Sequence, residues 1–153
     1  MSDDIRGLTA QLASDPGSLA FLDLAEALRR RGQLQAALTV AANGLGRYPE
    51  LADAHALHAR VLADLGDGES AFDAWMEALQ LDASHVGAHK GLGFLYHRSG
   101  DRRRALRHLE AAAEQLPEDR GLAAAIARVR AEGDVPAESR RSAGANGAAP
   151  PDG

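Results

Sequence analysis

The chain has 153 residues, of which 45% are hydrophobic and 25% are charged, a composition typical of one folded domain. Its formal net charge is -5, so no overall positive field attracts nucleic acid or anionic lipid, and it has no cysteine for disulfides, thiolate metal sites or a catalytic thiol. No apolar stretch approaches the roughly 18 residues of a membrane span, and the acidic N-terminus lacks the apolar region of a signal peptide, so we expect a cytoplasmic protein without membrane contact.

The first predicted element is a short amphipathic helix over residues 3–14, within an N-terminal packing segment of residues 1–17. We expect Ser2 to cap the start of this helix and Pro16 to break the chain after it. Its apolar face carries Ile5, Leu8 and Leu12. A single apolar face suits a helix that covers the exposed end of a repeat array.

A repeat with a period of 34 residues follows, marked by Gly32, Gly66 and Gly100. The same step relates three further sets of residues, namely Ala37, Ala71 and Ala105, then Ala25, Ala59 and Gly93, and then Leu28, Leu62 and Tyr96. Each period contains an apolar-periodic stretch of about 14 residues, a turn at the glycine and a second such stretch, which predicts a helical hairpin. Asp67 and Asp101 are placed to cap the second helix of their hairpins. The small residues are expected where the two helices approach most closely, because a larger side chain would force the helices apart.

These residues resemble the tetratricopeptide repeat family, whose unit has the same length. The third unit matches the family pattern best, with Leu92-Gly93, Tyr96, Gly100, Ala105, Leu109, Ala112 and Pro117. His55 and His89 depart from it, because a large apolar residue is usual at their position. The resemblance implies an all-α fold, a right-handed α-solenoid of three helix-turn-helix repeats with flanking helices at both ends. We expect the repeats at residues 18–51, 52–85 and 86–119.

The last predicted element is a C-terminal capping helix over residues 120–133. One of its faces carries Leu122, Ile126 and Val129. Residues 134–153 are expected to form a disordered tail, because no large apolar residue occurs from Ala137 onward to offset the entropy cost of ordering the chain.

The resemblance also implies a binding surface, because in this family the first helices of successive hairpins line a concave groove. The residues that it places there are Leu19, Leu22, Glu26, Arg29, Asp53, Leu57, Arg60, Asp64, Lys90, Phe94, His97 and Arg98. Apolar side chains within mixed charge suit an extended peptide or an amphipathic helix. Phe94 is the strongest anchor among them if its ring is open to solvent. The alternative is that this ring packs beside the C-terminal helix or tail.

One variant of the family binds a C-terminal carboxylate through basic and amide side chains at five groove positions. In this sequence those positions hold Leu22, Glu26, Leu57, Gly87 and Gly91. The resemblance therefore does not extend to that binding mode, and a cochaperone that binds the acidic tail of a heat-shock chaperone is disfavoured.

The turns inside the hairpins are expected to line one edge of the solenoid, which would bring Arg29–Arg31 to the same rim as Arg102–Arg104. One interpretation is a docking edge for an acidic partner, and the other, which we favour, is a solvated run of charges. Nucleic acid is disfavoured as a partner because carboxylates interrupt the strip and no aromatic residues interleave with it.

The histidines raise the hypothesis of a zinc site. His55 and His58 have i, i+3 spacing, His85 and His89 have i, i+4 spacing, and the two pairs fall on neighbouring hairpins. Against this hypothesis, the repeat register already accounts for His55 and His89, and no HExxH motif or cysteine ligand is present. We expect no metal, no other cofactor and no catalytic residue, since no pair of carboxylates is specified as buried and close together.

The sequence therefore predicts a scaffold or adaptor, possessing no enzymatic activity, that binds a partner peptide or domain in its groove. An assembly factor is one form of this function. The alternative is a structural subunit that forms a homodimer by stacking its terminal helices, with Leu122 and Ile126 as the residues to change in a test of that contact.

Overall fold

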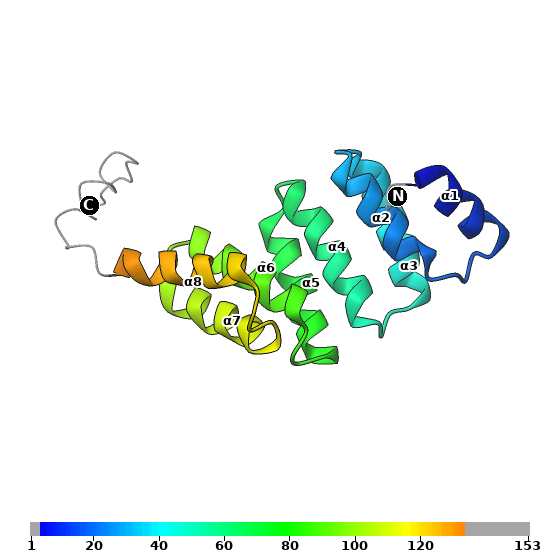
Figure 1. The fold of residues 1–153 in the computed structure, drawn as a ribbon. Helices are drawn as coiled ribbons and strands as arrows, with labels where there is room; N and C mark the ends of the chain where they lie inside the picture. Colours follow the sequence, from blue (N-terminus) through cyan, green and yellow to red (C-terminus); the bar gives the residue numbers. More distant parts are fainter. Residues whose placement is uncertain (1–3, 134–153) are drawn as a thin grey trace, which may run out of the picture.

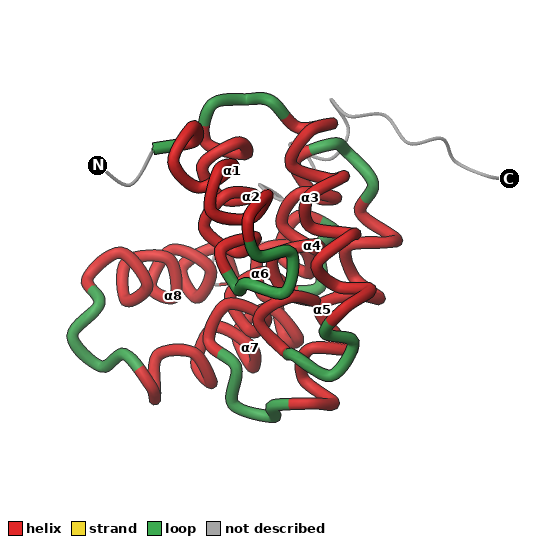
Figure 2. The backbone as a smooth tube through the Cα atoms, turned by 90° about the vertical axis from the view of Figure 1, so that its right-hand side faces the viewer, coloured by secondary structure: helices red, strands yellow, loops and turns green. Residues whose placement is uncertain are grey.

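The computed structural model describes residues 4–133, which form eight α-helices and no strand, and the all-α expectation is confirmed. The helices are α1 (Ile5–Ser14), α2 (Ala20–Arg30), α3 (Leu34–Arg47), α4 (Ala52–Asp64), α5 (Gly68–Leu81), α6 (Val86–Arg98), α7 (Arg102–Gln115) and α8 (Arg120–Gly133). They form an elongated stack with α1 at one end and α8 at the other (Figure 1), and the view turned by 90° shows helices joined by short loops (Figure 2). None of these eight helices is both long and apolar enough to cross a membrane.

The first helix begins two residues later than the sequence predicts. The carboxylate of Asp4 accepts a hydrogen bond from the backbone amide of Gly7 at 2.9 Å, so Asp4 is the N-cap of α1. An aspartate at this position satisfies an amide of the first turn and also suits the positive end of the helix dipole. Ser2 and the tail predicted over residues 134–153 lie outside the described part of the chain.

The three hairpin bends use the glycines of the repeat. Gly32, Gly66 and Gly100 have φ values of 80°, 91° and 89°, in the left-handed region that a side chain disfavours. After the third bend the amide of Asp101 donates back to the carbonyl of Tyr96 at 2.9 Å, and equivalent bonds occur at the other two bends. This hydrogen-bond pattern is the Schellman motif that ends a helix.

The predicted caps of the second helices are also present. Asp67 accepts from the amide of Ser70 at 3.1 Å, and Asp101 accepts from the amide of Arg104 at 3.0 Å. These hydrogen bonds stabilise the charged form and hold the pKa of both carboxyl groups below its usual range. In the first hairpin Gln33 stands at the corresponding place and makes no such side-chain bond.

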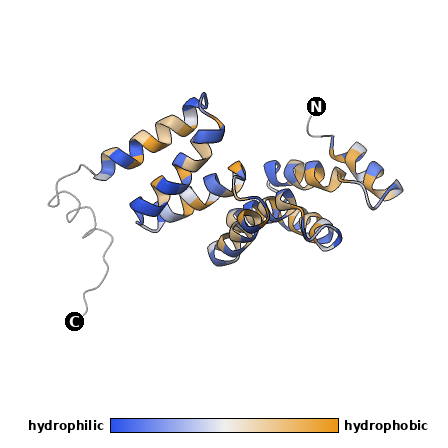
Figure 3. Cartoon of the chain, turned by 90° about the horizontal axis from the view of Figure 1, so that it is seen from below, coloured by the Kyte–Doolittle hydropathy of each residue, from blue (hydrophilic) through white to orange (hydrophobic). Residues whose placement is uncertain are grey.

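The core consists largely of small residues at which neighbouring helices touch. The alanines with no exposed surface are Ala25, Ala37, Ala41, Ala54, Ala59, Ala71, Ala78, Ala88, Ala105 and Ala112. Larger side chains from one helix fill the space above a glycine of the next. A Cβ atom on Gly93 would lie 2.6 Å from Leu109 Cδ2, and one on Gly44 would lie 2.0 Å from Phe21 Cδ2. Figure 3 shows apolar and polar residues alternating along each helix, as expected for amphipathic helices that cover one another.

The two ends of the stack are covered as the repeat predicts. Ile5, Leu8 and Leu12 of α1 pack against a cluster that includes Leu24 and Leu28. At the other end the apolar face of α8 packs on α7, and its residues Leu122, Ile126 and Val129 are 3%, 8% and 2% exposed. Leu122 and Ile126 therefore belong to the core of the monomer, so changing them cannot serve as a specific test of a dimer contact.

The histidines that depart from the family pattern bind the loops between hairpins. His55 Nε2 donates to the carbonyl of Pro49 at 2.7 Å, and His89 Nε2 donates to the carbonyl of Ala83 at 2.9 Å. The two donors, His55 and His89, are 34 residues apart, and so are the two acceptors, Pro49 and Ala83. The same contact therefore occurs in two successive repeats. A polar side chain replaces the usual apolar one here because it satisfies a carbonyl of the adjoining loop.

The third hairpin contains a stack of rings around His108. The ring centroids of Tyr96 and His108 are 5.6 Å apart with the rings nearly parallel, and Phe72 meets Tyr96 edge-on. His89 Nδ1 and His108 Nδ1 are 3.0 Å apart. Because His89 donates through its other nitrogen, its Nδ1 accepts here and His108 donates. Burial, together with the nearby charges of His89 and Arg107, lowers the pKa of His108.

Two glycines of α3 provide a matched pair for testing this packing. Gly44 lies under the buried Phe21 ring, whereas a Cβ atom on Gly46 would meet nothing within 4 Å. We expect Gly44→Ala to lower the free energy of unfolding by about 1–3 kcal/mol, because the added methyl group overlaps the buried ring and forces it to shift. Gly46→Ala is expected to raise it by up to about 1 kcal/mol, since alanine favours the helix. Urea unfolding followed by circular dichroism measures both, and a stabilising Gly44→Ala would contradict the described packing.

A second prediction concerns pH. The folded state holds the pKa of His108 and of His58 below the ordinary value, in both cases chiefly through burial. The unfolded chain therefore binds more protons as the pH falls through about 6.5, so the stabilisation is complete above that value and is lost below it. We expect a lower urea midpoint at about pH 5.5 than at about pH 7.5.

The variant His108→Gln tests whether His108 causes part of the loss of stability at low pH. Glutamine can still donate to His89 but does not titrate, so the variant should lose less stability than the unmodified chain over the same pH interval. An equal loss in both proteins would show that His108 is not a source of the pH dependence.

Candidate partner-binding groove

A single groove of about 820 Å³ runs along α2, α4 and α6, the first helices of the three hairpins. Ten of the residues that the sequence places in a groove line it, namely Leu22, Glu26, Arg29, Asp53, Leu57, Arg60, Asp64, Lys90, Phe94 and Arg98. Direct packing of α2 on α4 and of α4 on α6 brings residues from all three repeats together. The surface is thus built from positions distant in the sequence.

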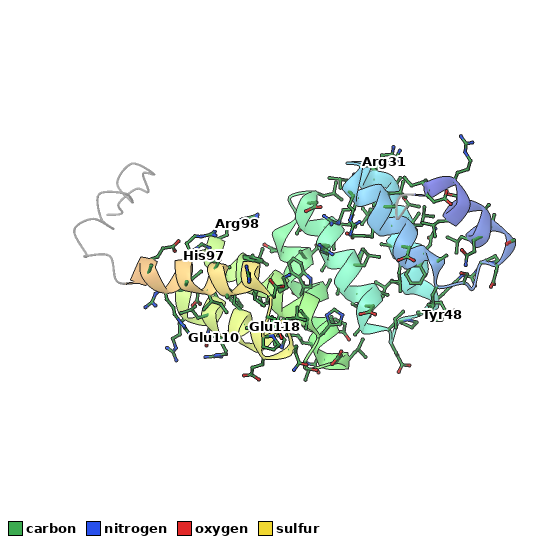
Figure 4. All side chains as sticks on the ribbon, in the orientation of Figure 1. Arg31, Tyr48, His97, Arg98, Glu110 and Glu118 are labelled. Carbon is green, nitrogen blue, oxygen red and sulfur yellow. The ribbon has the colours of Figure 1, made fainter. Side chains whose placement is uncertain are left out.

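Leu19 and His97 do not line this groove. Leu19 precedes the first turn of α2 and is 50% exposed. His97 Nε2 donates to Glu132 Oε1 of α8 at 2.7 Å, and Figure 4 shows His97 beside that helix. His97 therefore connects the last hairpin to the capping helix. The repeat register assigns His97 to the groove. This assignment is wrong because the repeat pattern does not specify where α8 lies relative to α6.

The groove also contains residues that register alone does not identify, above all Trp75. This residue belongs to α5, a second helix, and is 5% exposed. Its ring reaches the groove because Gly91 has no side chain, and a Cβ atom on Gly91 would lie 2.2 Å from Trp75 Cε2. The signal available in the sequence was the spacing of Gly87 and Gly91, which leaves a strip of α6 without side chains.

The wall formed by α2 carries charges that are paired with one another. Arg29 Nη2 lies 2.8 Å from Glu26 Oε2, and Arg29 Nη1 lies 2.8 Å from Asp64 Oδ2 on α4. Arg30 Nε is 3.1 Å from Glu26 as well. The hydrogen bond from Arg29 is the main reason why the pKa of Glu26 lies below its usual range. The contact between Arg29 and Asp64 connects the first two hairpins, and on this wall Glu26, Arg29 and Arg30 are paired.

The connection between the second and third hairpins also uses a carboxylate of the groove. His85 Nδ1 accepts from the backbone amide of Ala88 and thereby caps α6. Its Nε2 then donates to Asp53 Oδ1 on α4 at 2.7 Å. Asp53 is thus occupied by a contact within the chain.

The wall formed by α6 is different, because its cations have no such partners. Lys90, Phe94 and Arg98 follow one another at four-residue spacing and so lie along one face of the helix. Phe94 is 47% exposed, so its ring is open to solvent and is not packed away against the described C-terminal helix. Within residues 4–133 neither Lys90 nor Arg98 takes part in an ion pair or a side-chain hydrogen bond.

The arginine rim is only partly available for docking. Arg29 and Arg30 pair with Glu26, and Arg104 pairs with Asp101 at 2.9 Å. Figure 4 shows Arg31 and Arg98 along the same edge of the molecule. Half of the expected strip is therefore neutralised by contacts within the chain.

The histidines proposed as zinc ligands are separated by their own hydrogen bonds. Both ring nitrogens of His85 and both of His89 are used by protein atoms. In the part of the chain that the structure describes, no group of three or more histidine, aspartate or glutamate side chains is arranged to hold a metal ion.

Comparison with known proteins places this arrangement among tetratricopeptide repeat structures. No protein-family model and no curated protein sequence matches the chain. Among solved structures, TTC0263, a thermophilic TPR protein of Thermus thermophilus, is 26% identical and superimposes with a TM-score of 0.71 over 82% of this chain and 70% of that one. A crystal structure of MamA is 22% identical, with a TM-score of 0.63 over 74% of this chain and 67% of that one. A second MamA structure is 20% identical, with a TM-score of 0.67 over 82% and 69%.

The similarity to the MamA structures concerns the fold alone. The fold of three hairpins, the glycine bends and the similarity to TTC0263 agree with one another. The chain therefore has the fold of a tetratricopeptide repeat protein, and the resemblance drawn from the 34-residue period is confirmed.

Proposed function

We propose that this protein is a scaffold or adaptor that binds a segment of a partner protein in the groove of α2, α4 and α6, and that its activity is binding and not catalysis. The observation that carries this proposal is the exposed ring of Phe94 in a groove lined by all three repeats. An apolar ring in a concave surface favours association, because a partner side chain can remove it from water. Repeat proteins of this fold act in general as protein-interaction scaffolds.

The contacts between hairpins support the proposal energetically. Arg29 with Asp64 and His85 with Asp53 hold adjacent walls of the groove in a fixed relation. A surface that is ordered before binding loses less conformational entropy when a partner arrives. The groove is thus suited to recognition without a large rearrangement.

Self-association through the terminal helices is the alternative function. Leu122 and Ile126, the residues named for its test, are buried within the monomer. The exposed side of α8 instead carries small residues, among them Ala123, Ala127 and Ala131. No contact of the described residues favours this alternative. A role in assembly and a cytoplasmic location stay predictions from the sequence.

The variant Phe94→Ala tests the proposed function. The chain is immobilised, proteins retained from an extract of the native host are identified, and the affinity of the purified partner is measured by calorimetry. We expect Phe94→Ala to weaken binding at least about tenfold, or about 1.4 kcal/mol, because it removes the exposed apolar anchor. The thermal midpoint should not change, since the ring contributes little to the core.

Leu116→Ala is the matched control, since Leu116 is 39% exposed and lies outside the groove. This variant should bind like the unmodified chain. Equal affinities for all three proteins would show that the partner does not use the groove, and binding lost only on Leu116→Ala would place the interaction elsewhere.

A further inference from the structure

We propose that the groove selects an extended acidic segment in which one apolar residue lies between two carboxylates, and that this segment binds along Lys90, Phe94 and Arg98. This inference rests on the proposed function and adds the chemistry of the partner. It follows from the distribution of paired and unpaired charge among the residues that line the groove.

The carboxylates of the groove are mostly occupied. Glu26 binds Arg29 and Arg30, Asp64 binds Arg29, and Asp53 binds His85. Among the lining residues the remaining carboxylate is Asp23, which lies on α2, the wall opposite the third hairpin. A basic partner would therefore have to displace existing ion pairs before it gained new ones.

Within the described part of the chain, the cations on the α6 wall of the groove have no ion-pair partner, unlike Arg29 and Arg30 on the α2 wall. Lys90 and Arg98 have no ion-pair partner among residues 4–133, and Arg60 is 55% exposed with only a 3.7 Å approach to Glu26. An acidic partner gains attraction to these side chains without breaking any contact of the free protein. Charge complementarity therefore favours a negatively charged occupant beside α6.

The spacing along α6 specifies the arrangement of the acidic groups. Lys90 and Arg98 are eight residues apart, which corresponds to about 12 Å along a helix that rises roughly 1.5 Å per residue. In an extended chain, residues i and i+4 are about 13 Å apart, and residues i, i+2 and i+4 point to the same side. A segment of the form acid, any residue, apolar, any residue, acid thus places its carboxylates at Lys90 and Arg98 and its apolar side chain at Phe94.

The surface of α6 also favours an extended chain over a helix. Gly87 and Gly91 lie in the groove lining beside Lys90 and Phe94 and contribute no side chain there. The rings of Trp75 and His85 fill the places of these two missing side chains, so no side chain of α6 projects from the glycine positions themselves. An extended segment needs less room beside α6 than a helix, which has a diameter of about 10 Å with its side chains.

The experiment selects peptides from a randomised nine-residue library on the full-length chain and then measures the affinity of the enriched peptides by fluorescence anisotropy. We expect the enriched sequences to contain two acidic residues four positions apart with an apolar residue midway. Their binding should weaken with increasing salt. Trp75 is the single tryptophan and lines the groove, so its emission provides an independent signal of occupancy.

Charge reversal identifies the binding wall. Lys90→Glu combined with Arg98→Glu should weaken the enriched peptides at least about tenfold, because attraction becomes repulsion. Arg120→Glu combined with Arg128→Glu is the matched control, since it changes the net charge equally at two exposed α8 positions outside the groove. This control should retain the affinity of the unmodified chain.

The outcomes separate this inference from the proposed function. Enriched peptides that need Phe94 but are indifferent to the reversal of Lys90 and Arg98 would overturn the acidic-segment inference and leave the scaffold function intact. A library that gives no Phe94-dependent peptide, together with a native partner that binds regardless of Phe94, would overturn both.

Other occupants of the groove give distinct results. A single-stranded oligonucleotide that binds at least as tightly as the peptides would overturn the inference in favour of nucleic acid. Removal of residues 134–153 that strengthens peptide binding tenfold would identify the tail of this chain as the occupant. Peptide affinity that falls as protein concentration and light scattering rise would identify a second copy. Each of these results overturns the proposal of a separate acidic partner.

Discussion

The close contact of helices at alanine and glycine positions determines the geometry of the whole molecule. Ala25, Ala59 and Gly93 recur at the 34-residue step, and their lack of bulk lets the two helices of each hairpin pack at short distance. Because each hairpin is built alike, the next one packs on it in a similar orientation. The first helices therefore fall side by side, and the groove exists as a result of this repetition.

The architecture was predictable because it follows from periodic positions, whereas contacts between repeats were not. Gly32, Gly66 and Gly100 specify the bends, and the register of the first helices brings ten of the expected residues to the lining of one groove. His97 was misplaced because its partner Glu132 lies 35 residues away on α8. Trp75 was missed because its place in the groove depends on Gly91 of another hairpin. Register describes one helix face, but these side chains depend on the packing between elements.

The roles of the histidines also depend on packing that the periodicity of the sequence does not specify. Their spacing suggested a zinc site, and the repeat register explained only that His55 and His89 occupy one position. The structure adds the reason, since both side chains donate to a carbonyl of the preceding loop. A hydrogen bond to the backbone depends on the path of the loop, which no periodicity of side chains specifies.

The same ion pairs that fix the groove also determine what it can bind. Glu26 and Asp64 are paired with arginine side chains, which weakens their attraction for a basic partner, and Asp53 accepts a hydrogen bond from His85. Specificity depends on the difference in free energy between competing partners, so neutralising the acidic groups matters as much as leaving the cations of α6 unpaired. The positive and negative side chains that line the groove are nearly equal in number. The contacts that stabilise the stack nevertheless make the groove favour a negatively charged partner.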